Sequence, residues 1–182
     1  TMTDHANMMG AFHFVRAVKA YNASLADGIE GEKKEPIKPI IGCEFQVCED
    51  MHDRTHKDNG YQIVILAKNK NGYHNLAKMA SKAYTDGFYY MPRVDKNLVE
   101  EYKEDLIVLT GNMYGEVPSK ILNLGENQAE EALLWWKKHF GDDLYIEVMR
   151  HGQEDENRAN EVLINFARKH AIKIVATNNT YY

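Results

Sequence analysis

The sequence predicts an α/β fold in which strands alternate with helices around a mostly parallel sheet. Segments with helical apolar spacing follow short apolar segments along most of the chain. The segments 106–109 and 174–176 are continuously apolar, as expected when helices cover a parallel sheet. With 182 residues, 44% of them hydrophobic, and no internal repeat or hinge, the chain is expected to form a single domain over residues 1–182. A barrel and a doubly wound sheet both fit this pattern.

The amino-terminal half is expected to begin with a strand ending near Asp4 and a helix over about 7–22. One face of that helix carries Ala11, Phe14, Val15, Val18 and Tyr21. Two strands are expected at 40–47 and 61–67, the second after an Asn59-Gly60 turn signal. A helix should follow, with Tyr73, Leu76, Ala77, Ala80 and Tyr84 on one face. The polar segments 23–38 and 49–59 are expected to be loops and candidates for disorder, and no function is assigned to them.

The carboxyl-terminal half repeats the alternation of strands and helices. Its expected elements are a strand at 106–110, helices at 118–124 and 129–140, a strand at 144–148, a helix at 156–170 and a strand at 172–177. In such folds the functional side chains gather at the carboxyl ends of the strands, where loops vary above a rigid sheet.

Composition and charge exclude several classes of function. No apolar run approaches the roughly 20 residues of a membrane helix, and the first residues lack the pattern of a signal peptide, so a cytoplasmic protein is expected. The net charge of −5 argues against this segment being the part of a larger protein that grips a phosphate backbone. Cys43 and Cys48 have no second pair with which to form a zinc or disulfide framework, so both are expected to be reduced thiols.

Polar residues mark the predicted strand ends and suggest two alternatives. They are Asp4, His5, Glu44, Asn112, Arg150, His151, Asn178 and Asn179. Among them, Asp4, His5, Glu44 and His151 are of the types that bind a divalent metal and activate water for phosphoester hydrolysis. Without a fixed short spacing between ligands, the alternative is a polar rim held by hydrogen bonds.

Structural roles are favoured for the other histidines and for four aromatic residues that could contact nucleic-acid bases. His52 and His56 have a spacing that could bind metal on a helix, but the surrounding Asp and Gly residues favour a loop. His13, His74, His139 and His170 lie on expected helices or near their ends and are predicted to be surface residues. Trp135, Trp136, Tyr89 and Tyr90 could stack on bases, although such aromatics usually belong to a core or an interface, and a core position is favoured for Trp136.

Several motifs together resemble one family along almost the whole chain and in the same order. The carrying segments are Thr3-Asp4-His5-Ala6-Asn7-Met8-Met9-Gly10, Ile40-Ile41-Gly42-Cys43-Glu44-Phe45, Leu66-Ala67-Lys68-Asn69, Gly72-Tyr73-His74-Asn75-Leu76, Gly87-Phe88-Tyr89-Tyr90-Met91-Pro92-Arg93, Leu109-Thr110-Gly111-Asn112, Gly115-Glu116-Val117-Pro118, Arg150-His151-Gly152 and 175–182. These segments resemble the polymerase-and-histidinol-phosphatase (PHP) domain of the alpha subunit of bacterial DNA polymerase III.

The resemblance implies a fold and a context. The fold would be a distorted seven-stranded β/α barrel of the PHP type, incomplete here because the family's first strand, with its His-x-His pair, is not present before Thr1. The polymerase domains of the parent chain would follow residue 182, and the parent would use magnesium for DNA synthesis. Polymerase chemistry itself is therefore not expected in these residues.

The resemblance also implies a metal site that has lost most of its ligands. His5 and Glu44 match retained ligands, whereas Gln62 and Asn112 stand where the family has a histidine and a cysteine, and Asn179 and Tyr181 replace an aspartate and a histidine. Amides and a protonated phenol are poor replacements, because each removes charge or a strong donor. The expectation is a vestigial pocket without metal or cofactor, whose substituted groups can hydrogen-bond one another.

Two functions remain as alternatives. The favoured one is a catalytically inactive module that braces the polymerase and docks the proofreading exonuclease subunit among other replicase subunits, with DNA contacted through the parent polymerase. The rival is a metal-dependent 3′–5′ exonuclease or phosphoesterase with a reduced site built on His5, Glu44 and ligands from the missing first strand.

Overall fold

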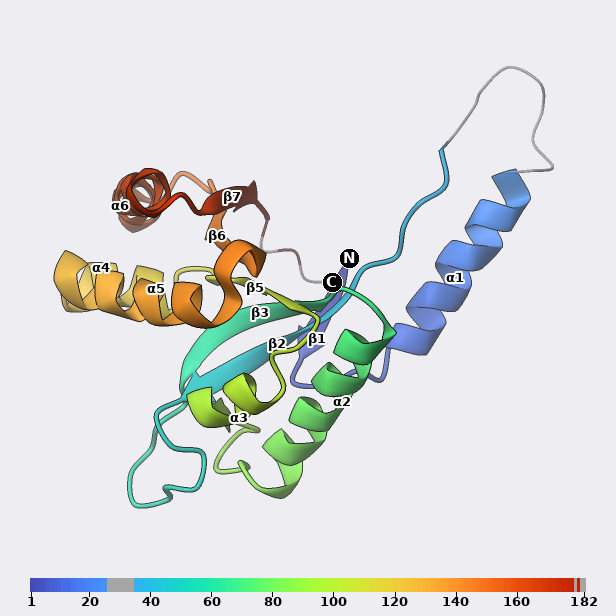
Figure 1. Cartoon of the computed structure of the whole chain (residues 1–182), viewed down its shortest axis with the longest axis horizontal. Coiled ribbons are helices and arrows are strands. Elements are labelled where there is room, and N and C mark those ends of the chain that lie inside the picture. The colour runs from blue at the N-terminus through green and yellow to red at the C-terminus, as the bar shows by residue number, and fades with distance from the viewer. Residues whose placement is uncertain (26–34, 179, 181–182) are drawn as a thin grey trace.

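The computed structural model describes residues 1–25, 35–178 and 180. Within them the chain has an α/β fold, a mixed β-sheet with flanking helices (Figure 1). The strands are β1 (Met2–His5), β2 (Ile41–Cys48), β3 (Tyr61–Ala67), β4 (Val94–Asp95), β5 (Leu106–Leu109), β6 (Leu144–Val148) and β7 (Lys173–Ala176). The α-helices are α1 (Ala11–Ser24), α2 (Lys70–Thr85), α3 (Lys96–Glu101), α4 (Glu116–Asn123), α5 (Glu126–Phe140) and α6 (Glu154–His170), and a 3-10 turn, η2 (Gly141–Asp143), precedes β6. The predicted alternation of strands and helices is confirmed.

The sheet runs in the order β1-β2-β3-β5-β6-β7, with β4 paired to β2 beside this path. Every strand is parallel to its neighbours except β3, which runs antiparallel to both β2 and β5. Only a loop separates β2 from β3, and a parallel pair would need a long crossover connection, so β3 must turn back. The path ends at β1 and β7, between which the described residues form no pairing. The mixed sheet with its flanking helices is consistent with the predicted PHP-type fold, and the predicted barrel, expected to be incomplete at its amino terminus, is not confirmed in the described residues.

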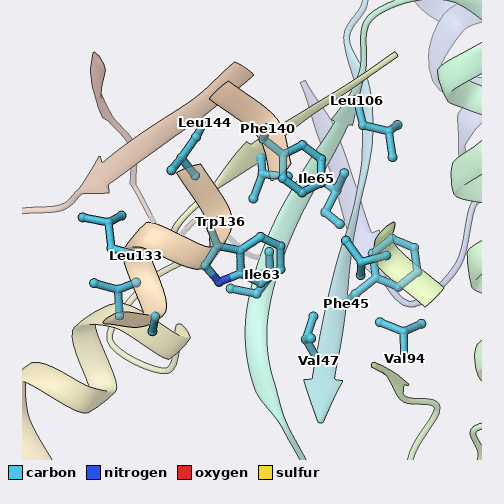
Figure 2. Packing of buried hydrophobic residues seen from close by; sticks show 14 of the residues in the cluster. Phe45, Val47, Ile63, Ile65, Val94, Leu106, Leu133, Trp136, Phe140 and Leu144 are labelled. Carbon is cyan, nitrogen blue, oxygen red and sulfur yellow. The ribbon is translucent and has the colours of Figure 1, made fainter. Parts of the chain in front are cut away.

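The main core lies between one face of the sheet and the helices that cover it. Ile63 and Ile65 of β3 lie beside Trp136 and Phe140 of α5, and Phe45 of β2 lies on the side of Val94 (Figure 2). Trp136 is 1% exposed, which confirms its predicted place in the core. Because side chains alternate between the faces of a strand, the residues between these, such as Glu44 and Val64, belong to the opposite face.

Helix α1 differs from its prediction in both start and burial. It begins at Ala11 rather than near residue 7, and Ala11 is its only buried residue. Phe14, Val15 and Val18 of the predicted apolar face are half-buried, and Tyr21 is 42% exposed. Figure 1 shows α1 projecting away from the sheet, which explains why an amphipathic pattern did not lead to burial. Residues 26–34 of the adjoining predicted loop lie outside the described part of the chain.

The 49–59 segment is a loop, as predicted, but it has defined contacts. Asp50, Asp53 and Asp58 each accept a hydrogen bond from a backbone N–H two residues further along. The guanidinium of Arg93, which is completely buried, donates to the carbonyl oxygens of Met51, Asp53, Asp58 and Gly87. One distant cation therefore holds this loop and the turn before β4 together.

The structure also contains a short strand and a short α-helix that the sequence did not predict, β4 and α3. Strand β4 pairs Val94 with Val47, and Asp95 then caps α3 by accepting a hydrogen bond from the Leu98 N–H at 2.9 Å.

Cys43 and Cys48 are free thiols, as predicted, and burial raises their pKa to about 12 and about 11. None of the helices in the described part of the chain has the length and apolar character needed to span a bilayer.

Candidate functional site

A cavity of about 940 Å³ lies on the face of the sheet opposite the main core. Strands β1, β2, β5, β6 and β7 run in one direction, so their carboxyl ends share one edge, and β3 adds its amino-terminal end there. Val64, Leu109 and Val175 form part of the apolar wall. A concave, mainly apolar pocket with a few convergent polar groups is the usual form of a ligand site.

The predicted candidates at the strand ends fall into two groups. Asp4, His5, Glu44, Asn112 and Asn178 line the cavity together. Arg150, His151 and Gln62 do not line it, although Gln62 lies in register with Gln46 on β2. Asn179 and Tyr181 lie outside the described residues, so their predicted places stay predictions.

His5 and Glu44, the two predicted ligands that the sequence retains, lie in contact with each other. The parallel register places the two residues opposite each other, with His5 Nδ1 2.7 Å from Glu44 Oε1. Glu44 is buried, whereas the His5 side chain is 55% exposed. Burial raises the pKa of the Glu44 carboxyl, and the nearby Glu147 carboxylate raises it further, although His5 acts in the opposite direction.

Glu147 is a site residue that the sequence analysis missed. It is 5% exposed on β6, lines the cavity, and accepts a hydrogen bond from Thr177 Oγ1 at 2.5 Å. Its Oε2 has no hydrogen-bond partner among the described residues, and burial raises its pKa. The available signal was a single acidic residue inside the apolar strand Leu144-Tyr145-Ile146-Glu147-Val148.

The two amides at predicted ligand positions, Gln62 and Asn112, lie in different local environments. Asn112 Oδ1 accepts a hydrogen bond from the backbone N–H of Tyr114 at 2.8 Å, in a local turn. The buried Gln62 Oε1 has no hydrogen-bond partner within the described part of the chain. The expected bonding among the substituted groups also involves Asn179 and Tyr181, which lie outside the described residues, so it stays a prediction.

His151 forms a separate cluster that joins the β6–α6 loop to the segment after β7. Its Nδ1 lies 2.8 Å from Glu156 Oε1 and its Nε2 2.5 Å from Asn178 Oδ1. The hydrogen bonds to Glu156 and Asn178 raise the pKa of His151 above its usual range. Burial alone would raise the pKa of Glu156, but its bonds to His151 lower it below the usual value. His151 is thus a structural link in the described residues.

We expect this link to make stability depend on pH. A raised histidine pKa stabilises the fold fully below the unfolded value of about 6.5, and this contribution is lost as the pH rises through the folded pKa. The lowered pKa of Glu156 stabilises above about 4.3 and is lost as the pH falls through its folded pKa. His151→Gln should therefore lower the thermal midpoint more at pH 5.5 than at pH 8.5. His13→Gln, at an exposed position on α1, is the control; an equal shift at both pH values would contradict the role of His151.

The chain shows extensive similarity to known proteins. Residues 1–151 match the PHP domain family. Over the whole chain it is 39% identical to DNA polymerase III subunit alpha of Thermus aquaticus, 38% to that of Treponema pallidum and 36% to that of Borreliella burgdorferi. The chain spans only about 14–15% of the length of these relatives. Since the family match covers most of its residues, the chain belongs to the PHP domain family.

Proposed function

We propose that this chain is the PHP portion of a cytoplasmic bacterial replicative polymerase of the DNA polymerase III alpha type. The proposal is supported by similarity that extends over the complete chain in relatives bearing that name. Those relatives are several times longer than this chain, so the magnesium-dependent synthesis of DNA would be performed by other parts of the parent protein.

The sheet of the longer protein is proposed to close into a barrel of the PHP type. Both edges of the described sheet border the same cavity, which is lined by Met2 and Asp4 of β1 and by Val175 of β7. An unpaired strand edge exposes backbone donors and acceptors that an additional strand can satisfy. A strand inserted between β1 and β7 would also cover the open side of the cavity.

The pocket in this barrel is proposed to be vestigial as a metal site. The observation that carries this proposal is the presence of neutral amides, Gln62 and Asn112, at two positions that the resemblance assigns to metal ligands. Among the described residues no three His, Cys, Asp or Glu side chains are grouped so as to hold a metal ion. A di- or trinuclear cluster needs several charged or imidazole ligands, and the donors described here do not fit one.

A domain without metal chemistry can still support the polymerase structurally and bind other proteins. We propose that it braces the polymerase and docks the proofreading exonuclease subunit, together with other replicase subunits. The test is the affinity of the purified exonuclease subunit for the parent polymerase with and without this domain. Removal of the domain should abolish high-affinity binding, whereas unchanged binding would exclude the docking role.

One observation favours the rival function, a metal-dependent exonuclease whose metal site has fewer ligands than the family pattern. Glu147 brings a second buried carboxylate into the pocket that holds Glu44 and His5, and its Oε2 has no partner among the described residues. A buried acceptor without a donor is costly, and a cation would relieve that cost. Burial also raises the pKa of both carboxyls, and a proton satisfies such a pair equally well. The rival therefore remains second.

A further inference from the structure

Four aromatic side chains gather where α2 ends and the chain turns toward β4: Tyr84, Phe88, Tyr89 and Tyr90, here called the aromatic patch. Tyr84 and Phe88 are 49% and 48% exposed, and their rings stack with centroids 6.3 Å apart. Tyr90 is 67% exposed and meets the Tyr89 ring edge to face at 4.6 Å. Large apolar rings that cluster at the surface, rather than occurring singly, mark a site of interaction.

The backbone under the aromatic patch is held in one conformation. Arg93 donates from Nε to the Gly87 carbonyl oxygen and from its other nitrogens to the 51–58 loop. A Cβ atom added at Gly87 would lie 2.0 Å from the Arg93 carbonyl oxygen, so this close approach requires glycine. Tyr90 has a φ of +63°, an unfavourable conformation for a tyrosine that persists only where surrounding contacts impose it. The rings are therefore presented by a rigid support, which limits the entropy lost on binding.

Two cations stand at the rim of the aromatic patch. Lys57 Nζ lies 5.3 Å from the centroid of the Tyr90 ring, and Arg54 Nη2 donates to the Asp86 carbonyl oxygen at 3.4 Å. Neither forms an ion pair with a carboxylate in the described part of the chain. Asp53, in the same loop, is instead engaged with Thr55 and His56. Asp86, at the end of α2, lies 3.7 Å from the ammonium group of Lys82. The positive charges of Lys57 and Arg54 can therefore meet the carboxylates of a partner.

The ring geometry distinguishes between partner classes. Single-stranded nucleic acids bind by stacking bases on open aromatic faces. Here Tyr84 and Phe88 each use one face on the other, and Lys57 lies over a face of Tyr90. Tyrosine and arginine, in contrast, are the residue types that dominate binding energy in protein interfaces.

We propose that the aromatic patch is a docking surface for a protein segment that places an apolar side chain on the Tyr84–Phe88 pair and carboxylates against Lys57 and Arg54. This inference rests on the proposed function, because it names the surface through which the module would bind its partner. It specifies the partner by its chemistry, an apolar anchor flanked by acidic residues.

The test uses the full-length polymerase that carries this chain and its purified exonuclease subunit as the probe. Phe88→Ala with Tyr90→Ala should weaken binding by about tenfold or more, since truncating anchor residues has effects of that size. Lys57→Glu with Arg54→Glu should also weaken binding, most strongly at low salt. The control is Phe12→Ala with Tyr114→Ala, which removes two rings that are 68% and 71% exposed outside the aromatic patch and should change affinity less than about twofold.

The patch substitutions and the deletion of the whole domain give different results depending on which of the two proposals fails. If the subunit binds the wild-type protein through this domain but ignores the Phe88 and Tyr90 changes, the aromatic patch is not the surface and the docking function stands. If deletion of the domain leaves binding unchanged, both fall. If a labelled single-stranded oligonucleotide loses binding in the double variant while the subunit does not, the surface serves nucleic acid and the inference is wrong. Unaltered thermal midpoints establish that the variants are folded.

Discussion

Replacing Glu116 with alanine is expected to lower the free energy of unfolding of the 182-residue chain by about 3–5 kcal/mol. Glu116 is 4% exposed at the start of α4, where its Oε1 accepts hydrogen bonds from Lys96 and Lys120 and its Oε2 accepts one from the Trp136 indole. Burial alone would raise its pKa, but the two ammonium groups lower it, so the carboxyl is charged near neutral pH. Its removal would leave two cations and a buried N–H without their acceptor.

Urea denaturation followed by tryptophan fluorescence measures this loss directly, because Trp136 is one of the bonded partners. Glu116→Gln, which keeps the shape and an acceptor oxygen, should lose less than Glu116→Ala. Glu130→Ala is the matched control on α5, since Glu130 pairs with Lys169 and His170 near the surface and should matter much less. Equal losses for Glu116→Ala and Glu130→Ala would show that the buried cluster has no special role.

Replacing Arg93 with methionine is expected to cost at least about 3 kcal/mol, because hydrogen bonds to a charged donor each contribute about 1.5–3 kcal/mol. The change leaves the carbonyl oxygens of Gly87, Met51, Asp53 and Asp58 without their donor. Limited proteolysis should then cleave the 51–58 loop, which Arg93 holds in the native chain.

The geometry of the guanidinium should be as important as its charge. Arg93→Lys keeps the charge, but one ammonium cannot reach acceptors spread over two loops, so most of the loss should remain. Arg158→Met removes an exposed arginine of α6 and should change stability by no more than about 0.5 kcal/mol. A stable, protease-resistant Arg93→Met variant would contradict the structural role given to Arg93.

Local patterns in the sequence predicted strands best where turn signals and apolar runs agree. The Asn59-Gly60 signal and the apolar run after it placed β3 at Tyr61–Ala67, with the same bounds as in the structure. For α1 the apolar pattern predicted a helix but not its exposure, because helical spacing shows which residues share a face and not whether another element covers that face. Strand β4 was missed because two residues, Val94 and Asp95, leave no periodicity to detect.

The candidate site was predicted in part, for a related reason. His5 and Glu44 could be paired from motifs, and the register of β1 and β2 does bring them together. Glu147 was not predicted because the rule for parallel sheets points to residues that follow a strand, whereas Glu147 lies within β6 and faces the cavity. The contacts of Arg93 join positions 35–42 residues apart, and such distant pairings leave no local signal.

The central proposal, a pocket that has lost its metal chemistry, is tested most directly on the intact polymerase. Metal content and manganese-dependent 3′–5′ nuclease activity should be measured for the wild-type protein and for a variant carrying His5→Ala and Glu44→Ala. We expect no stoichiometric metal attributable to this domain and no nuclease activity that the two substitutions remove. Stoichiometric metal and nuclease activity in the wild-type protein, both lost in the variant, would contradict the proposal and establish the rival function.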